Sequence, residues 1–313
     1  MSCIFSIIIP FHNEKEKINL LIDSIENLSK ESPNFEVIFV NNKSSDGTKD
    51  IIVSRKFMVE DALDVASSYY ARNIGASCAN GEYLVFIDAD CILDPFILVE
   101  YFKYICSAKN PLNSVFAGLI KPAIDQEGNI YEKYAAKRKI LNQQSAITGW
   151  AYRPFAQTAN AMYSIDAFLK VGGFDASMTT GGDAEICWRF ADQLNADFIF
   201  AESAVVLHQH RKDISGLMAQ FHKYGVGRIQ QLRVSERFSK EKKEQFELPI
   251  ESAKKMMKLI EEAHLADEVI FEIIDFIRNC AYSTGVLNGV LNEIAKTRCE
   301  MPFSAMHDIL NCD

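Results

Sequence analysis

The chain has 313 residues, 48% of them hydrophobic and 24% charged, which suits one large folded domain or a domain with an appendage. Its net charge of -9 argues against a nucleic-acid partner and against simple electrostatic adhesion to anionic lipid. The eight cysteines are scattered without a CxxC pair, so we expect reduced core thiols rather than disulfides or zinc ligands.

The hydropathy pattern predicts no membrane span. The chain opens directly into "CIFSIIIP" without a basic region or a cleavage site, so we expect no secretory signal. The most apolar stretch, "VIFEIIDFIRNCAYSTGVL", is interrupted by Glu272, Asp275 and Arg278, and a span needs about 20 apolar residues. We therefore expect a cytoplasmic protein, with peripheral contact to the inner face of a membrane as the alternative.

Short apolar runs alternate with amphipathic segments in the first half of the chain. Three continuous apolar runs predict buried strands: residues 6–10, 35–41 and 83–90. Amphipathic segments that predict helices follow them, at residues 18–28, at residues 48–57 and after Asp94. Asp94 suits a helix N-cap and Pro95 the first helical turn. This alternation predicts an α/β fold with a mostly parallel sheet flanked by helices.

Polar clusters follow the predicted strands. They are "PFHNE" after the first, "NNKSSDGT" after the second and "DAD" at the end of the third. Because ligands bind beyond the carboxyl ends of strands in such sheets, we expect a binding site at this edge. From about Ile214 the pattern changes to helices without strands, so we expect an α/β domain at residues 1–212 and a helical region at 213–313.

Asp88 and Asp90 end the third predicted strand with only Ala89 between them. A capping role leaves this pair unexplained, because Asp94 already suits the cap of the next helix. Carboxylates so close raise each other's pKa unless a cation neutralises them. Mg²⁺ and Mn²⁺ prefer oxygen ligands together with substrate phosphates. The spacing alone leaves a plain turn and a metal–phosphate site as alternatives.

The surrounding segment, "ARNIGASCANGEYLVFIDAD", resembles the region before and including the DxD motif of family-2 glycosyltransferases. Five further segments resemble the family in its order: "IIIPFHNE", "VNNKSSDGT", "QTANAMYSIDAFLKVGGFD", "GGDAEICWR" and "VVLHQH". The resemblance implies the Rossmann-like GT-A fold with a helical C-terminal extension. It also implies metal-dependent, inverting sugar transfer from a nucleoside-diphosphate sugar, with UDP favoured, to a hydroxyl acceptor in glycan or glycolipid synthesis. The implied cofactor is Mn²⁺ or Mg²⁺.

The resemblance also implies roles for the residues at the matching positions. The residues implied at the nucleotide are Pro10, Phe11, Asn13, Glu14, Asn41, Asn42, Ser44, Arg72, Asn73 and Asp88. Asn41 stands where the family commonly has Asp, so the identity of the base stays open, and "NNKSSDGT" is also a plain turn. Asp90 would ligate the cation that bridges the two phosphates, with Asp88 at the ribose and a bound water.

His208 and His210 lie one residue apart at the end of an apparent strand, hence on the same face. They are either structural or an extra metal or phosphate contact, as late histidines are in related folds. We also expect an acceptor side that includes Trp150, Asn160 and Trp188.

Asp183 and Glu185 form the second carboxylate pair, at an apparent helix start where acidic side chains also suit the helix dipole. Under the family reading, one of them is the general base that accepts the proton of the acceptor hydroxyl. We prefer Asp183. Glu185 is the alternative base or a partner for Arg189, and Gly182 stands where the family often has Glu.

Two other functions remain open. A degenerate family member would bind a nucleotide sugar without transfer, although "DAD" and "GGDAE" are both present. A sugar-1-phosphate nucleotidyltransferase would need a glycine-rich basic loop after the first strand, and "PFHNEKEK" has no glycine. The C-terminal helices would dock an acceptor, a lipid-linked substrate or a second copy of the chain.

Overall fold

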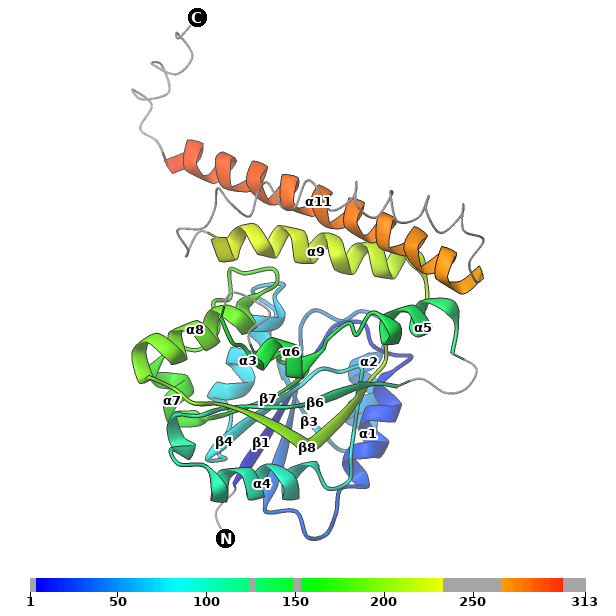
Figure 1. The fold of residues 1–313 in the computed structure, drawn as a ribbon. Coiled ribbons are helices and arrows are strands. Elements are labelled where there is room, and N and C mark those ends of the chain that lie inside the picture. The colour runs from blue at the N-terminus through cyan, green and yellow to red at the C-terminus, as the bar shows by residue number, and fades with distance from the viewer. Residues whose placement is uncertain (1–3, 124–127, 149–152, 233–265, 301–313) are drawn as a thin grey trace, which may run out of the picture. The chain divides into compact units, whose positions relative to one another are not determined.

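The computed structural model describes residues 4–123, 128–148, 153–232 and 266–300 (Figure 1). These residues fall into two compact units. The first unit comprises the described residues up to Met178 together with Gly182–Arg211, and the second comprises Thr179–Gly181 and the described residues from Lys212 onward.

An eight-stranded sheet in the order β3-β2-β1-β4-β7-β6-β8-β5 forms the centre of the first unit. Its strands are β1 (Phe5–Phe11), β2 (Phe35–Asn41), β3 (Met58–Asp61), β4 (Tyr83–Ile87), β5 (Cys91–Leu93), β6 (Val115–Pro122), β7 (Asn160–Ser164) and β8 (Phe198–His208). Strands β3, β2, β1 and β4 are parallel, β7 is antiparallel to both of its neighbours, and β6 and β8 are parallel. The prediction of an α/β fold with a mostly parallel sheet is confirmed.

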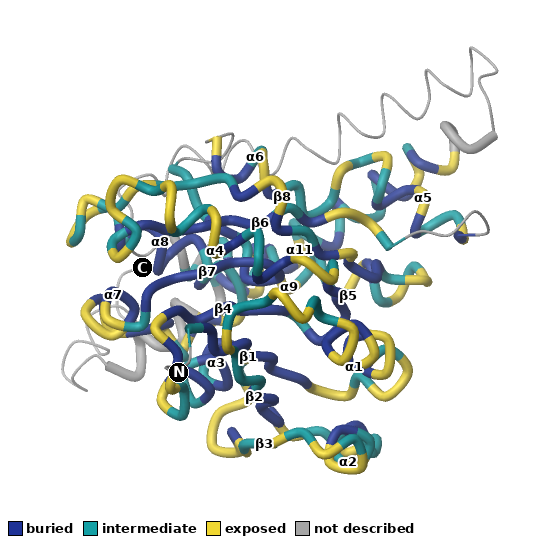
Figure 2. Tube along the Cα trace, turned by 90° about the horizontal axis from the view of Figure 1, so that it is seen from below, coloured by how far each residue is buried: buried dark blue, intermediate teal, exposed yellow. Residues whose placement is uncertain are grey.

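Helices surround this sheet. They are α1 (Ile18–Glu26), α2 (Thr48–Ser54), α3 (Ser68–Ser77), α4 (Ile97–Ser107), α5 (Ile130–Lys137), α6 (Gln143–Thr148), α7 (Ile165–Lys170), α8 (Gly182–Leu194) and the 3₁₀ helix η1 (Pro111–Asn113). Successive residues of β1 point to opposite faces, so Ile7 and Ile9 join the core under α1 and α4. Ile8 joins the core under α3 and α8. Both faces of the central strands are therefore buried (Figure 2).

Gly75 sets the distance between α3 and the sheet. A Cβ atom at this position would lie 2.5 Å from Cγ2 of the buried Ile8. The absence of a side chain at Gly75 therefore permits the close packing of α3 on β1.

The structure differs from the sequence predictions at several elements. Strand β4 ends at Ile87, three residues before the predicted end, so Asp88 and Asp90 follow the strand. Strand β3 was not predicted, because it has four residues and lies at the sheet edge, where its first residue Met58 is exposed. Helix α4 begins at Ile97 with Phe96 as its N-cap. Asp94 instead accepts a hydrogen bond from the Phe96 N–H at 2.9 Å, so its capping turn precedes the helix.

The second unit contains α9 (Ile214–Leu232) and α11 (Ala266–Glu300), which pack closely on each other. A Cβ atom at Gly225 would lie 2.1 Å from the carbonyl oxygen of Tyr282, and one at Gly285 would lie 2.0 Å from that of His222. Within the described residues, no helix has the length and apolar character that crossing a membrane requires.

Candidate active site

The loops after β1 and β2 are hydrogen-bonded to each other at the carboxyl edge of the sheet. The Asn13 N–H donates to Ser44 Oγ at 3.1 Å, and the Ser45 N–H donates to Asn13 Oδ1 at 2.8 Å. The Glu14 N–H donates to Thr48 Oγ1 at 3.0 Å. Asn13 has a φ of 56°, in the left-handed region that Asn adopts more readily than most residues. Two of the polar clusters found in the sequence thus form one connected surface.

Asn41 and Asp61 lie side by side at the ends of β2 and β3. The parallel register pairs the two residues directly. Asn41 Nδ2 donates to Asp61 Oδ1 at 2.9 Å, and Asn41 Oδ1 accepts from the Ser44 N–H at 2.9 Å. Lys49 Nζ lies 2.7 Å from the second Asp61 oxygen. Asp61 and Lys49 were not singled out in the sequence.

The other residues implied at the nucleotide from these strands are partly structural. Asn42 Nδ2 donates to the carbonyl oxygens of Ala62 and Val65, both at 2.8 Å. Phe11 is 2% exposed and belongs to the core, as the alternation of β1 dictates. The expectation that the Phe11 ring lines the nucleotide therefore does not fit its position, and Pro10 is buried in the same strand.

Arg72 is a buried residue that orients Asp88. Its side chain is 4% exposed, and Nη2 donates to Asp88 Oδ1 at 2.5 Å. The guanidinium carbon lies 5.5 Å from the ring centre of Tyr69 and 6.0 Å from that of Phe174. The Nε atom of Arg72 has no partner among the described residues. Arg72 thus supplies a fixed positive charge beside the DxD segment.

Asn73, the next residue, is tied to the loop after α7. Its Nδ2 donates to the Phe174 carbonyl oxygen at 2.8 Å, and its Oδ1 accepts from the Phe174 N–H at 2.9 Å. Both polar atoms of the side chain are therefore used by the backbone of a distant loop.

Asp90 lies between His208 and Lys17. The pairing of Cys91 with His208 brings the end of β8 to Asp90, so that His208 Nε2 lies 3.3 Å from Asp90 Oδ1. Lys17 Nζ donates to Asp90 Oδ2 at 3.3 Å. Burial alone would raise the pKa of Asp90, but His208, followed by Lys17 and Arg211, holds it well below its usual range. Asp90 is a carboxylate at neutral pH.

His210 lies beside His208, with 4.9 Å between the ring centres. Burial, and then the charge of His208, lowers the pKa of His210 to about 4. The His210 imidazole is therefore neutral at pH 7 and has a lone pair available.

These residues fit a divalent cation. Asp90 is already ionised and lies 3.3 Å from Nε2 of His208, whose other ring nitrogen, Nδ1, is buried without a partner among the described residues. No group of three or more His, Cys, Asp or Glu side chains in the described ranges forms a complete cage. Mg²⁺ and Mn²⁺ need none, since one or two carboxylates suffice when substrate phosphates supply the remaining oxygens.

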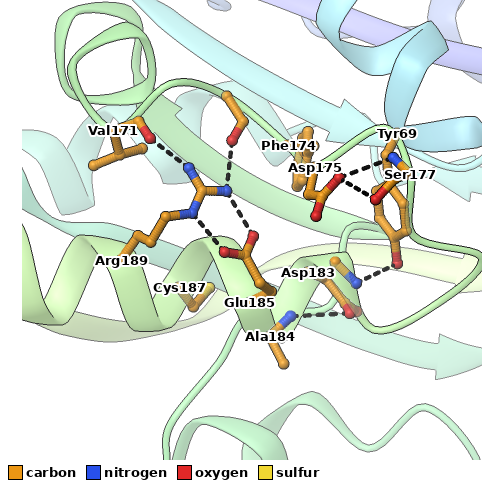
Figure 3. A network of polar contacts seen from close by, with 12 residues as sticks. Tyr69, Val171, Phe174, Asp175, Ser177, Asp183, Ala184, Glu185, Cys187 and Arg189 are labelled. Atoms are coloured by element: carbon orange, nitrogen blue, oxygen red, sulfur yellow. Dashed lines mark hydrogen bonds and ion pairs between the residues drawn. The ribbon is translucent and has the colours of Figure 1, made fainter. Parts of the chain in front are cut away.

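Asp183 lies in the first turn of α8 (Figure 3). Its Oδ1 accepts from the Ala184 N–H at 3.0 Å, and the Gly182 N–H donates to the Tyr69 hydroxyl at 2.9 Å. Burial raises the pKa of Asp183 to about 6, against the Ala184 hydrogen bond and the charge of Arg72. Asp183 keeps partial solvent access despite the surrounding protein atoms.

Tyr69 also explains the glycine at 182. A Cβ atom there would lie 2.9 Å from the Tyr69 ring, so the ring fills the place of a larger side chain.

Glu185 is paired with Arg189 through two hydrogen bonds. Arg189 Nε donates to Glu185 Oε1 at 2.7 Å and Nη2 donates to Oε2 at 2.6 Å. Arg189 also donates to the carbonyl oxygens of Val171 and Gly173 (Figure 3). Both carboxylate oxygens of Glu185 are therefore engaged in fixing α8 to the loop after α7. Asp183 forms no ion pair among the described residues, which favours it over Glu185 as a base.

A match to a protein-family model shows which family the chain belongs to. The model of glycosyl transferase family 2 matches residues 6–169, which is more than half of the chain. The chain belongs to glycosyl transferase family 2. It is therefore a nucleotide-sugar-dependent glycosyltransferase.

Curated relatives and solved structures agree with this assignment. The glycosyltransferase AglE of Haloferax volcanii is 28% identical over 232 residues, covering 72% of this chain and 73% of that protein. The poly-beta-1,6-N-acetyl-D-glucosamine synthase of Staphylococcus epidermidis is 28% identical over 199 residues, covering 59% of this chain and 45% of the synthase. This chain thus matches less than half of the synthase's length.

Two solved structures share the GT-A fold with this chain. The mannosyltransferase PcManGT from Pyrobaculum calidifontis, solved with GDP-Man and Mn²⁺, has a TM-score of 0.56 at 15% identity and covers 99% of this chain and 79% of its own. The glucosyl-3-phosphoglycerate synthase from Mycobacterium tuberculosis, solved with Mn²⁺, UDP and glucosyl-3-phosphoglycerate, has a TM-score of 0.51 at 17% identity and covers 74% and 79%. At these identities the likeness shows the fold.

The acceptor-side expectations for this family-2 glycosyltransferase have different outcomes. Asn160 is 0% exposed and is bonded to the Tyr101 hydroxyl at 2.7 Å and to the carbonyl oxygens of Leu119 and Ala204 at 3.1 and 2.9 Å. Its place on a central strand with both faces covered excludes contact with an acceptor in this conformation. Trp188 is buried in α8, and Trp150 lies outside the described residues.

Lys17 is a site residue that the sequence reasoning missed. Its Nζ lies 3.3 Å from Asp90 and 3.7 Å from Glu14, the first residue of the same turn. Burial raises the pKa of Glu14, while Lys17 opposes that shift. The sequence does not indicate this role, because Lys17 stands immediately before the apolar face of α1, where an ordinary surface lysine is expected.

Proposed function

We propose that this glycosyltransferase moves one sugar from a nucleoside-diphosphate sugar to a hydroxyl acceptor, with inversion and with a divalent cation at Asp90. The observation that carries the proposal is the Asp183 carboxylate. It has no ion pair within the described part of the chain, and it lies close enough to the Arg72–Asp88 pair to interact with both charges. A base and a charged diphosphate site thus share one edge of the sheet. The Mn²⁺ in the complexes of the two solved relatives supports the cation.

Asp183 has the properties that a general base needs near neutral pH. With a pKa of about 6 it is mostly ionised at pH 7, yet basic enough to accept a proton as the acceptor oxygen attacks. The acceptor O–H bond breaks toward Asp183 while the new bond forms to the anomeric carbon. The bond from that carbon to the diphosphate breaks on the opposite side, and its electron pair leaves with the diphosphate. A single displacement of this kind inverts the anomeric configuration.

The leaving diphosphate is met by positive charge. A bound Mn²⁺ or Mg²⁺ would neutralise charge on its oxygens. Lys17 and the buried Arg72 add fixed cations from α1 and α3, and Arg72 also keeps Asp88 oriented. For the donor we propose a UDP-sugar in the first place, and for the acceptor a hydroxyl of a glycan or a glycolipid.

Release of the nucleoside diphosphate and the configuration of the product test this proposal together. The chain, the Asp183→Asn variant and the Asp90→Ala variant are incubated with Mn²⁺ and a set of UDP- and GDP-sugars, with water as the default acceptor. Proton NMR follows the first-formed anomer of the released sugar. We expect slow release by the native chain, an inverted first-formed anomer and no release by either variant.

Two results would contradict the proposal. A first-formed anomer that retains the donor configuration would exclude single displacement. Tight donor binding without any release, across sugars and acceptors, would favour the non-catalytic binding protein instead.

A further inference from the structure

At the end of the nucleotide site that would contact the base, Asn41 is not the residue best placed to accept a hydrogen bond from a ligand. Both polar atoms of the Asn41 side chain are already engaged, Oδ1 by the Ser44 N–H and Nδ2 by Asp61, each at 2.9 Å. Asn41 is therefore held in one orientation, and because it is only 6% exposed, the remaining lone pair and N–H of its amide have little access to a ligand. The carboxylate that can accept a hydrogen bond at this edge of the sheet lies on β3, the strand that pairs with β2.

Asp61 is that acceptor. It lies opposite Asn41 in the β2–β3 register and is fixed by two donors, Asn41 Nδ2 on one oxygen and Lys49 Nζ on the other. Lys49, and after it Asn41, holds the pKa of Asp61 below its usual range. The side chain is 40% exposed. Each carboxylate oxygen accepts two hydrogen bonds, so one lone-pair direction on each remains open to solvent.

Lys49 gives this site a donor beside the acceptor. Its side chain is also 40% exposed, so its ammonium group keeps donors free beyond the one that Asp61 takes. Two exposed apolar side chains, Leu63 and Val65, follow Asp61 in the loop to α3. That loop is anchored to Asn42 through the carbonyl oxygens of Ala62 and Val65. Binding a planar heterocycle requires a hydrogen-bond acceptor, a hydrogen-bond donor and apolar surface, and all three are present here.

We propose that Asp61 and Lys49, with Asn41 as their positioning residue, read the donor nucleobase and select bases that carry a ring N–H next to a carbonyl oxygen. Uracil, thymine and guanine have this edge: the ring N–H donates to Asp61 and the carbonyl oxygen accepts from Lys49. Cytosine and adenine present the reverse order, a ring nitrogen acceptor and an exocyclic amine, so that acceptor would face acceptor. The inference rests on the proposed function and extends it to the donor's base.

Binding of five nucleoside diphosphates tests the inference. Dissociation constants for UDP, dTDP, GDP, CDP and ADP are measured by calorimetry with Mn²⁺ for the native chain, Asp61→Asn, the swap variant Asn41→Asp/Asp61→Asn, and Asp50→Asn. Asp50 is an exposed acidic residue in the first turn of the same helix as Lys49, so its variant controls for the loss of one negative charge. Melting temperatures without ligand confirm that each variant is folded.

We expect the native chain and Asp50→Asn to prefer one or more of UDP, dTDP and GDP over CDP and ADP by about tenfold or more, as for a hydrogen bond to a charged acceptor. Asp61→Asn should lose most of that ratio, and the swap variant should regain part of it, because it restores a carboxylate at the strand ends. The ratio between bases is informative because a merely structural defect would weaken all five ligands alike.

Each contrary outcome has one meaning. A native preference for CDP or ADP, no preference at all, or a preference unchanged in Asp61→Asn would overturn the assignment of Asp61 while leaving the proposed transferase standing. Failure of the native chain to bind any of the five nucleotides would overturn both.

Discussion

Replacing Asp183 with asparagine removes the proposed proton acceptor while preserving the shape of the side chain. The Ala184 N–H still finds an oxygen, so the first turn of α8 should keep its geometry. We expect the rate of sugar transfer to fall by about 10²–10⁴-fold, the usual contribution of a general base. Donor binding should be retained, because the Arg72–Asp88 pair is untouched.

The same substitution should stabilise the fold above pH 6. Burial raises the pKa of Asp183 from 3.8 to about 6, a difference of roughly 2 units or about 3 kcal/mol between the protonated and ionised forms. Because the folded-state pKa is the higher one, the native chain has this stability in full below pH 3.8 and loses it as pH rises through 6. The partial solvent access of Asp183 makes about 3 kcal/mol an upper bound.

Melting temperature and transfer rate, each measured from pH 4.5 to 8.5, separate the effect of the substitution on stability from its effect on catalysis. The melting temperature of Asp183→Asn should lie closest to the native value at pH 4.5, the acid end of this range, and exceed it by several degrees at pH 8. The native transfer rate should rise with pH through about 6 and then level, and this acid limb should vanish with the variant's activity. Asp166→Asn, which removes an exposed carboxylate on α7, is the matched control and should change neither curve.

Transfer at the native rate by Asp183→Asn, or an unchanged acid limb in its residual activity, would refute the assignment of the base. Loss of activity together with a lower melting temperature at every pH would point instead to a structural role.

Three further substitutions probe how the site is held. Glu185→Gln should lower the free energy of unfolding by about 3 kcal/mol in denaturant titrations, because it leaves the charge of Arg189 half-buried and unpaired; a change below 1 kcal/mol would contradict a structural Glu185. Gly75→Ala should lower the melting temperature by a few degrees, because the added methyl group would overlap a buried isoleucine of β1 at 2.5 Å; a higher melting temperature would show that α3 can move away. Asn73→Ala should cost about 2 kcal/mol in stability by removing two hydrogen bonds to the Phe174 backbone, and calorimetry with the preferred nucleotide then shows whether Asn73 also contacts the donor.

The sequence predicted the inner part of the sheet well. Strands β1, β2 and β4 are continuous apolar runs, and their order with the intervening helices dictates parallel pairing. The edge strand β3 carries no such run, because a strand with one neighbour need not be apolar on both faces. The polar clusters at the strand ends also located the site, since carboxyl ends of parallel strands share an edge.

The roles of individual residues were less accessible, because they depend on contacts between distant segments. Lys17 meets Asp90 across 73 residues, and Asp61 meets Asn41 only through the register of β2 and β3. Arg72 reads as a surface residue until α3 is packed on the sheet. By contrast, the pairing of Glu185 with an arginine four residues on was visible as a helical spacing.

Asn160 shows how a family resemblance can misplace a residue. The resemblance put it on the acceptor side, but strand β7 lies between β4 and β6, where a polar side chain is retained only if it is fully bonded. The strand that Asn160 begins, β7, is buried along its whole length.

Thermal stability with Mn²⁺ and nucleoside diphosphates tests most directly the claim that a cation at Asp90 binds the donor. The native chain and Asp90→Ala are melted with UDP or GDP, each with Mn²⁺ and with the metal chelated. At 100 times its dissociation constant a ligand adds about 2.7 kcal/mol, which is several degrees in melting temperature. We expect a rise that needs Mn²⁺ and is absent in Asp90→Ala. A rise that survives chelation and the Asp90 substitution, or no rise with any nucleotide, would contradict the account.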